Sequence, residues 1–434
     1  MFRQWIREQG FCIADKLKKS RVSKHYSDIK KIIENPELAE SLNKKRLQLI
    51  LNNAVSNTEF YEKYKGFCSL QDFPVVDKNI LRSNYNSIKS KDFKEEELWK
   101  MTTSGSTGSP FTIYQPIEKH YRVQAELIYF SQWADYKVGT KHMFAHVVAS
   151  QNRKSKLKLW MQNEVDFDVS DQSDRALEKQ CNILMKDKKI KIIIGYASAV
   201  YSLAEFAIKK GYNPSLFGLE GIITASEPLY DDMRKTIIEA FGCKVLQRYS
   251  NMENGVLGHE CVEHKEFHIN RASYIVELLS LESDLPVDEG EIGRIVVTDL
   301  FNTAMPMIRY DTGDIGIMQN ESKCNIKTPV LTRLDGRRVD NIYNTRGEMI
   351  SPHAITNGFW KYSNVLKQFQ FIQEDINRYK IILNVMDNFN HESIILSTIK
   401  SIVGDNSIVE VEYRNEIPVL NSGKRKYIVC NYKK

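Results

Sequence analysis

Six hydroxyl side chains and two glycines fill the eight positions from Thr102 to Ser109, in the stretch TTSGSTGS. Glycine lets a backbone approach a ligand closely, and a series of exposed N–H and hydroxyl groups can cradle phosphate oxygens. A polar surface linker would have the same composition. The residues that follow, FTIYQ at 111–115, are typical of a β-strand. Because a strand follows so closely, we favour a tight phosphate-binding turn over a linker.

Three later stretches bring carboxylates and hydroxyls to places where ligands bind. They are ASEP at 225–228, YSNMEN at 249–254 and YDTGD at 310–314. The first two each follow an apolar run that is typical of a buried strand, and parallel α/β sheets bind ligands outside the carboxyl ends of their strands. Purely structural interpretations stand beside this one. ASEP also fits a capping box for the helix after it, and TGD is common in turns.

The elements that position these residues alternate between strand and helix. Residues 191–200 are typical of a strand that runs into a helix. Strand-like runs return at 219–229 and 243–255, separated by an amphipathic segment at 230–242. This alternation predicts a mostly parallel α/β sheet.

The segments before this region are predicted to be mainly helical. Residues 1–65 and 117–136 are predicted to be helical, and Asp77 is predicted to be a helix N-cap. Phe2, Trp5, Ile6 and Ile13 line one helical face, which we expect to dock on the protein body rather than on a membrane.

Towards the C-terminus, between residues 270 and 333, the strands become shorter, which predicts an antiparallel or barrel-like part. Residues 333–341 are predicted to form a turn between segments. The last ninety residues or so have the pattern of a small α+β unit. We therefore predict an α/β protein whose large N-terminal domain (1–336) combines mostly parallel sheets with the barrel-like part. A small α+β C-terminal domain (337–434) follows.

Composition excludes several function classes. The 434 residues are 42% hydrophobic and 27% charged, which is ordinary for a globular protein. The net charge of +6 is mild, and no nucleic-acid-binding fingerprint accompanies the basic residues, so we expect no nucleic-acid partner. The densest basic stretches, at 16–24 and 152–158, are predicted to be solvated faces.

The cysteines and the hydropathy of the sequence indicate in which cellular compartment the protein is found. Seven cysteines, an odd number without a CxxC pair, fit a reduced intracellular protein. No apolar run is long enough for a transmembrane helix, and the first residues lack the features of a signal peptide. We expect a cytoplasmic protein, and a homodimer is one of the assemblies compatible with this sequence.

Taken in order, the motifs resemble a known set. The hydroxyl-glycine loop, ASEP, YSNMEN, YDTGD with GRRVD, and finally NSGKRK resemble those of the AMP-forming acyl-adenylate ligases, in the branch of the phenylacetate–CoA ligases and CapK-like proteins. Residues 291–316 carry the most specific part of the resemblance. In this family a carboxylate attacks the α-phosphate of ATP, which gives an acyl-adenylate and pyrophosphate. An acceptor then displaces AMP, and it is either a thiol such as coenzyme A or an amine, as expected for CapK-like members linked to surface polysaccharides.

The resemblance also implies site residues. The phosphate loop would comprise Thr103, Ser104, Gly105, Ser106, Thr107 and Gly108, with Thr107 taking part in catalysis. Ala225, Ser226, Glu227 and Pro228 would pack near the adenine, with Tyr249 and Ser250 beside them and Tyr249 stacked on the ring. Glu253 would hold Mg²⁺, a cation that prefers carboxylate and phosphate oxygens.

Three more residues complete that site. Asp314 would accept hydrogen bonds from the ribose hydroxyls, and Arg337 would reach the ribose or a phosphate. Lys424, in NSGKRK, would be brought to the α-phosphate by a mobile C-terminal domain that hinges at or near Asp340. A long-stemmed point charge suits such a transient role.

The chain departs from the family pattern at four positions. They are Ser109, where many members have lysine, Ser250, Met252 and Val339. These departures keep a second hypothesis open, in which a catalytically degenerate relative binds nucleotide or acts as a scaffold. Some relatives also carry structural zinc, and here Cys261, His268 and Cys324 would supply three ligands. Ile326 stands where a fourth ligand would be expected.

Overall fold

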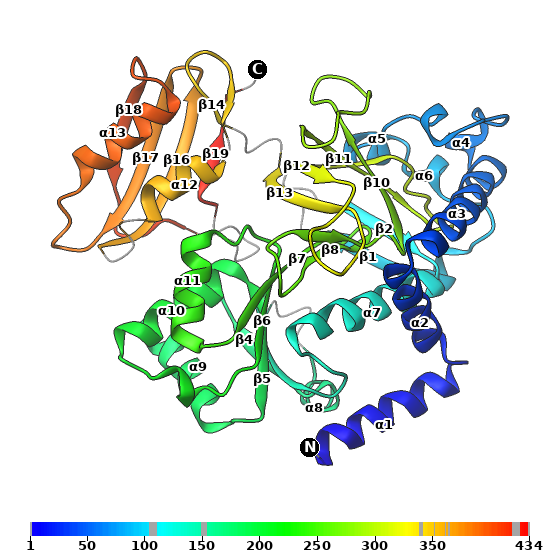
Figure 1. The fold of residues 1–434 in the computed structure, drawn as a ribbon, viewed down its shortest axis with the longest axis horizontal. Coiled ribbons are helices and arrows are strands. Elements are labelled where there is room, and N and C mark those ends of the chain that lie inside the picture. Colours follow the sequence, from blue (N-terminus) through cyan, green and yellow to red (C-terminus); the bar gives the residue numbers. More distant parts are fainter. Residues whose placement is uncertain are drawn as a thin grey trace.

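The computed structural model describes residues 2–103, 111–148, 154–337, 342–350, 352–360, 362, 365–418 and 426–432. Figure 1 shows a large body with a smaller C-terminal unit, coloured orange to red, on one side of it. Residues 104–110 of the hydroxyl-glycine loop, Val339, Asp340 and Lys424 lie outside the described residues.

The helices predicted over residues 1–65 are present, as α1 (Phe2–Leu17), α2 (Arg21–Glu34), α3 (Pro36–Asn57) and α4 (Glu59–Glu62). Two short helices follow, α5 (Lys78–Ser83) and α6 (Tyr85–Ile88). The Asp77 side chain accepts a hydrogen bond of 2.8 Å from the backbone N–H of Ile80, which confirms it as the N-cap of α5. The docking prediction for α1 is wrong, because Trp5, Ile6 and Ile13 are all exposed.

A hairpin and a buried helix follow. Strands β1 (Trp99–Thr103) and β2 (Phe111–Gln115) pair antiparallel, with Thr103 opposite Phe111. The two ends of the hydroxyl-glycine loop are therefore held against each other, as expected for a tight turn rather than a tether. Helix α7 (Ile117–Ser131) confirms the helix expected after the loop.

The central α/β region has the predicted alternation. Its elements are β3 (Lys141–His146), α8 (Lys156–Gln162), β4 (Glu164–Asp168), α9 (Asp174–Lys186), β5 (Ile190–Tyr196), α10 (Ala197–Lys209), β6 (Gly221–Ala225), α11 (Asp231–Phe241) and β7 (Lys244–Asn251). Helix α9 buries Leu177, Cys181 and Leu184 at helical spacing. These side chains join those of α10 and α11 in one apolar core against strands β3 to β6.

The antiparallel part predicted between residues 270 and 333 is present, as β10 (Tyr274–Leu279), β11 (Ile292–Asp299), β12 (Tyr310–Gln319) and β13 (Val330–Arg337). The expectation of shorter strands there is wrong, because β11, β12 and β13 have 8, 10 and 8 residues and β3 to β6 have 5 to 7. Two earlier strands, β8 (Gly255–Glu260) and β9 (Phe267–Ile269), also pair antiparallel. These six strands continue the parallel strands within one sheet of 11 strands, in the order β10-β11-β12-β13-β9-β8-β7-β6-β5-β3-β4. The turn predicted at 333–341 is wrong for residues 333–337, which belong to β13.

A second, four-stranded sheet makes up most of the C-terminal unit. Its elements and the short strands before it are β14 (Ile342–Tyr343), β15 (Met349–Ile350), α12 (Pro352–Trp360), β16 (Leu366–Asp375), β17 (Arg378–Val385), α13 (Glu392–Val403), β18 (Ile408–Tyr413) and β19 (Ile428–Cys430). The predicted α+β character is therefore confirmed. The boundary between residues 336 and 337 stays a prediction.

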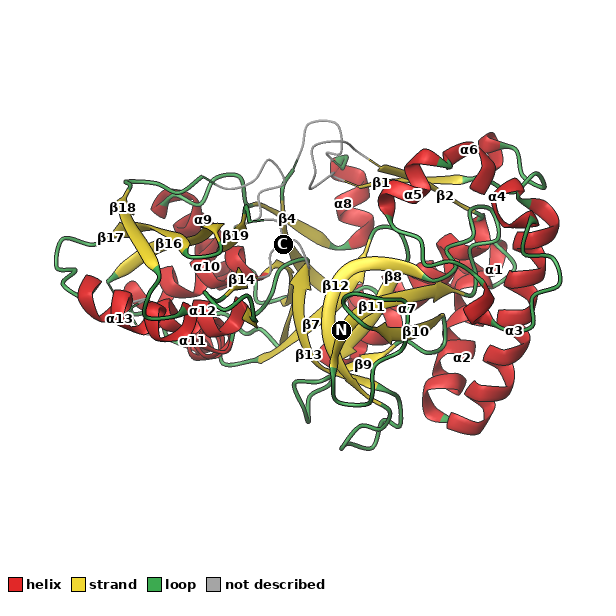
Figure 2. Ribbon diagram, turned by 90° about the horizontal axis from the view of Figure 1, so that it is seen from above, coloured by secondary structure: helices red, strands yellow, loops and turns green. Residues whose placement is uncertain are grey.

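The two parts share an apolar contact. Tyr230, just before α11, meets Tyr427 edge to face with ring centroids 6.1 Å apart. Side chains of α12 and β16 belong to the same core cluster as those of α10 and α11. Figure 2 shows the C-terminal helices α12 and α13 on the same side as α11. None of the described helices combines the length and apolarity that crossing a membrane requires.

Candidate active site

Two neighbouring parallel strands, β6 and β7, carry predicted site residues at their carboxyl ends, beside the end of β5. Tyr196 at the end of β5 is in register with Ala225 on β6, and Ala225 is in register with Arg248 on β7. The loop after β6 and the aromatic residue Tyr249 therefore lie at neighbouring strand ends. Strand β7 is also where the sheet changes from parallel to antiparallel pairing. This is the kind of position at which α/β sheets bind ligands.

The loop after β6 is shaped by a strained residue and a buried carboxylate. Ser226 has a φ of 70°, in the left-handed region that non-glycine residues rarely adopt. Glu227 is buried, and its Oε2 accepts a 2.9 Å hydrogen bond from the N–H of Ser198 in the first turn of α10. The capping-box interpretation is thus wrong for the following helix, α11, whose N-cap is Tyr230. Glu227 caps α10 instead, which leaves the loop beside it in a fixed shape.

Tyr249 and Asp314 form one unit. The Tyr249 hydroxyl donates a 2.8 Å hydrogen bond to Oδ2 of Asp314 on β12. Burial, with the negative charge of Asp314 next, raises the pKa of Tyr249 well above its usual range, so the phenol stays protonated as the donor. Across the ladder, Asp314 is in register with Arg337 on β13. The structure therefore brings together three positions that the sequence assigned to one nucleoside.

Glu253 is a buried carboxylate that already faces a cation. It lies in the turn between β7 and β8, and its Oε1 is 2.5 Å from Nζ of Lys78 at the start of α5. The hydroxyl of Tyr310 lies 3.3 Å from the same oxygen, and burial raises the pKa of Tyr310. Backbone hydrogen bonds between Val76 and β12, including Asp311 N–H to Val76 O at 2.8 Å, hold the start of α5 beside this carboxylate.

Sequence reasoning missed Lys78. The residue follows the recognised N-cap Asp77, so it was visible only as the first residue of a helix. Its partner lies 175 positions later in the chain. No local pattern predicts such a pair.

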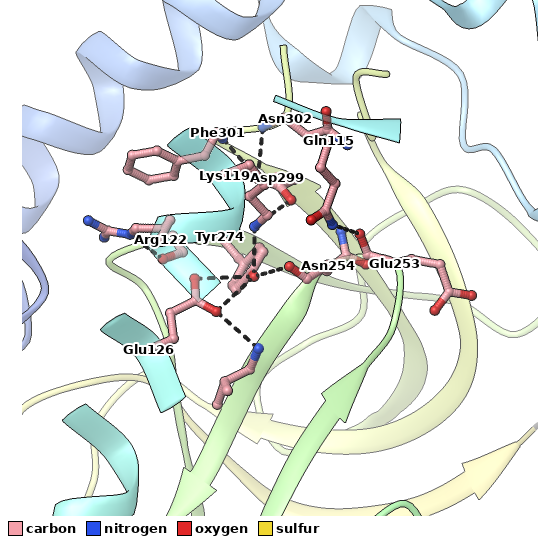
Figure 3. Close-up of polar contacts among 12 residues, drawn as sticks. Gln115, Lys119, Arg122, Glu126, Glu253, Asn254, Tyr274, Asp299, Phe301 and Asn302 are labelled. Atoms are coloured by element: carbon pink, nitrogen blue, oxygen red, sulfur yellow. Dashed lines mark hydrogen bonds and ion pairs between the residues drawn. The ribbon is translucent and has the colours of Figure 1, made fainter. Parts of the chain in front are cut away.

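A buried polar network supports the turn that carries Glu253, and Figure 3 shows its members pointing toward one another. Nε2 of Gln115 donates to the backbone oxygen of Glu253 at 3.0 Å, so the end of hairpin β1–β2 opposite its loop is tied to this turn. The Tyr274 hydroxyl donates to the backbone oxygen of Asn254 at 2.7 Å. Glu126 accepts from the Val256 N–H at 3.1 Å, and burial raises the pKa of this carboxyl group.

A fully buried ion pair anchors the same network. Lys119 Nζ lies 2.7 Å from Oδ2 of Asp299 and donates to the Tyr274 hydroxyl at 2.9 Å, with the side chains of Lys119 and Asp299 inaccessible to solvent (Figure 3). Gly255, at φ 128°, passes so close that a Cβ would stand 2.6 Å from Oε2 of Glu126. Only glycine fits that position without displacing the network.

The predicted cysteine–histidine cluster also forms. The donor atoms of Cys261, His268 and Cys324 lie within 4.8 Å of one another, and all three residues are buried. Cys324 Sγ is 3.3 Å from Nε2 of His268, whose other ring nitrogen is 2.9 Å from the Thr328 hydroxyl. Such a second hydrogen bond fixes the orientation of a metal-ligating imidazole.

Two regions of the predicted site remain as predictions. Ser104–Gly108 and Lys424 lie outside the described residues, and only the strand position of Thr103 and of Arg337 is described. Of the departing residues, Met252 is exposed beside Glu253 and Ser250 is half-buried at the end of β7.

Comparison with known proteins identifies relatives of this chain. Residues 342–431 match the family described as the CapK C-terminal domain. Protein CapK of Staphylococcus aureus is 26% identical, over 96% of this chain and 94% of that protein. Phenylacetate–coenzyme A ligase of Thermus thermophilus is also 26% identical, over 72% of this chain and 75% of its own length. The resemblance to this branch is confirmed.

Solved structures establish the fold. A 2-hydroxyisobutyryl-CoA ligase in the postadenylation state, in complex with 2-HIB-AMP, superposes with a TM-score of 0.74 at 18% identity, covering 92% of this chain and 90% of that one. An anthranilate CoA ligase in complex with anthranoyl-AMP gives 0.54 at 15% identity, covering 77% and 67%. The predicted fold of a large α/β domain followed by a C-terminal unit is that of these ligases.

Proposed function

We propose that this chain, which has the fold of the adenylate-forming ligases and resembles CapK and the phenylacetate–CoA ligases over most of its length, is an ATP-dependent carboxylate-activating ligase. It would form an acyl-adenylate with release of pyrophosphate and then transfer the acyl group to an acceptor. The observation that carries the proposal is the convergence of Tyr249, Asp314 and Glu253 at one edge of the sheet.

The nucleoside end of the proposed site is prepared by hydrogen bonding. The Tyr249 hydroxyl holds the Asp314 carboxylate in place, which leaves that group as an acceptor for sugar hydroxyls. Arg337 would add a donor from the neighbouring strand. The fixed loop Ala225–Pro228 would line the base.

The phosphate end suits a divalent cation. Glu253 is a buried carboxylate, and the ammonium group of Lys78 lies 2.5 Å away. A carboxylate is a ligand that Mg²⁺ prefers, and an ammonium group attracts phosphate oxygens. Bound Mg²⁺ would neutralise charge that develops on the transferring phosphate. Glu253 would hold the ion, Lys78 would contribute a second positive charge, and Thr103–Gly108, including Thr107, would donate hydrogen bonds to phosphate oxygens. Lys424 would act on the α-phosphate.

The acceptor is coenzyme A or an amine. A 2-hydroxyisobutyryl-CoA ligase crystallised with 2-HIB-AMP and CoA shares this fold, with a TM-score of 0.60, and supports the thiol. An amine acceptor, and with it a role in surface polysaccharide synthesis, is what the resemblance to CapK-like proteins implies. The structure has no disulfide among its described residues, which supports the predicted cytoplasmic location.

Pyrophosphate release tests the proposal. Mg·ATP is offered with a panel of carboxylic acids, each with and without coenzyme A or candidate amines, and Lys424→Ala is the control. Release that requires one acid and is lost in the variant supports adenylation, and the acceptor that speeds turnover identifies the product. ATP binding without release for any acid would favour a degenerate nucleotide-binding relative. Absence of ATP binding contradicts both.

We also propose a structural zinc ion at Cys261, His268 and Cys324. Two backbone N–H groups, of His264 and Ile326, point at the cysteine sulfurs at 3.4 and 3.3 Å, an arrangement that stabilises thiolate ligands. The three protein donors match the ligand types that zinc prefers, with the fourth position left to another group.

Metal analysis of the purified chain is expected to find about one zinc per molecule, in keeping with a single site. Cys324→Ser is expected to lose the metal and to melt at a lower temperature, because the ion stabilises only the folded state. Cys68→Ser, at an exposed cysteine that is not part of the cluster, is the control. Full zinc occupancy in Cys324→Ser would contradict this assignment.

A further inference from the structure

Two helices, α1 and α8, carry seven of the exposed large apolar side chains. Among the described residues, α1 exposes Trp5, Ile6, Ile13 and Leu17, and α8 exposes Leu157, Trp160 and Met161, with exposed fractions from 47% at Ile6 to 83% at Leu17. We call these seven residues the α1–α8 patch. A contiguous exposed apolar patch marks an interaction site more often than a random surface feature.

The two helices touch each other. The Arg7 guanidinium donates to the backbone oxygen of Trp160 at 3.2 and 3.3 Å and lies 5.2 Å from the centre of its ring. Both helices lie along the same lower edge of the molecule in Figure 1, away from the C-terminal unit. The two helices therefore adjoin at Arg7 and Trp160, although α1 and α8 are more than a hundred residues apart in the chain.

Helix α1 is already attached by its opposite face. Gln4 donates to the hydroxyl of Thr140 at 3.2 Å, and a Cβ on Gly139 would stand 2.8 Å from the backbone oxygen of Gln4. Asp15 accepts hydrogen bonds from the N–H groups of Val22 and Ser23, both at 3.0 Å. The helix is thus fixed by these polar contacts and by Phe11, which packs against a buried cluster, while Trp5, Ile6, Ile13 and Leu17 stay exposed.

Basic residues are frequent in the two segments that carry this patch, although Arg21 and Lys154 pair with Glu118 and Glu164. Residues 2–24 contain seven lysines and arginines and two acidic residues, and residues 154–162 contain three lysines and no acidic residue. In α8, Lys156 and Lys158 fall on either side of the stripe formed by Leu157, Trp160 and Met161 at helical spacing. The described parts of the two densest basic stretches, predicted to be solvated faces, thus lie in or next to the helices that carry the exposed apolar residues.

We propose that the α1–α8 patch docks on the surface of an anionic lipid bilayer. A helix with tryptophan and aliphatic residues on one face and lysines at its margins lies in the plane of the interface. Tryptophan favours the headgroup level, and lysines are attracted by anionic lipids. A second copy of the chain is a poorer occupant, because a two-fold contact through one face would set these basic stretches against each other.

Vesicle sedimentation of the full-length chain tests the proposal. We expect binding to vesicles of phosphatidylcholine with phosphatidylglycerol, weaker binding to pure phosphatidylcholine, and loss of binding as salt rises. Changing Lys16, Lys18 and Lys19 together to alanine should weaken binding by about tenfold or more. The pair Ile13→Ser and Leu17→Ser should weaken it by about tenfold or more as well. Leu285→Ser, at an exposed leucine in the loop after β10, is the matched control and should bind like the wild type.

Tryptophan quenching separates insertion from simple adsorption. Brominated lipids are expected to quench the wild-type fluorescence and to quench the Trp5→Phe, Trp160→Phe double variant much less, since the remaining tryptophans stay on the body. Circular dichroism and pyrophosphate release without vesicles verify that each variant folds. Absence of vesicle binding, or equal binding to neutral and anionic vesicles, contradicts the proposal. A wild-type dimer that Leu17→Ser converts to monomers, without vesicle binding, would assign the patch to chain–chain association.

Discussion

Glu253→Gln is expected to lower the rate of pyrophosphate release by about a hundredfold or more, because the ion that this carboxylate would hold is worth several kcal/mol of charge stabilisation. Glutamine keeps the size of the side chain and can still accept from Tyr310. It removes the negative charge that faces Lys78 at 2.5 Å. The rate should therefore fall without loss of the fold, and the Mg²⁺ concentration needed for half-maximal rate should rise.

A steady-state assay across Mg²⁺ concentrations measures both effects. Glu321→Gln, at an exposed carboxylate, is the control and should leave both unchanged. Lys78→Met completes a double-mutant cycle, since coupled residues give non-additive losses. If Lys78 and Glu253 act together on the phosphates, the double variant should lose less than the sum of the two single losses. A wild-type rate and Mg²⁺ dependence in Glu253→Gln would remove this residue from the mechanism.

The second large effect is on stability. Lys119→Met is expected to cost about 3–5 kcal/mol, because removing one partner of a buried ion pair leaves the other charge uncompensated. The stranded group would be Asp299, whose Oδ1 also accepts from the N–H groups of Phe301 and Asn302 at 2.8 and 3.2 Å. Urea denaturation followed by circular dichroism measures the loss.

Two comparisons sharpen this result. Lys235→Met removes an exposed ion pair with Asp232 and should change stability by at most about 1 kcal/mol. Adding Asp299→Asn to Lys119→Met should restore part of the lost stability, because asparagine keeps an acceptor for the two N–H groups without a buried charge. A loss in Lys119→Met no larger than that in Lys235→Met would mean that the pair contributes little to folding.

The features that the sequence predicted correctly are those that depend on residues close together in the chain. The alternation of strands and helices between β5 and β7, and the N-cap at Asp77, depend on residues a few positions apart. Glu227 shows where local patterns fail. Its neighbours suggested a cap for the next helix in sequence, but its carboxylate meets the preceding helix, α10, across the fold.

Side-chain contacts across the chain were not predictable. The pairing of Lys78 with Glu253 depends on β12 passing beside the start of α5, which no sequence period encodes. The outward apolar face of α1 was misjudged for a related reason. An amphipathic pattern shows that a helix has an apolar side, but whether that side meets the body depends on which polar contacts hold the helix.

The register of Asp314 opposite Arg337 has a thermodynamic consequence. Arg337 is the last residue of its strand, and the chain then leads into the C-terminal unit. A ligand bound at Asp314 therefore contacts the β12–β13 ladder, and β13 is the strand from which the chain continues into that unit. Coupling free energies are reciprocal. If the proposed nucleotide shifts the equilibrium between two orientations of the C-terminal unit by some factor, then the favoured orientation binds the nucleotide more tightly by the same factor.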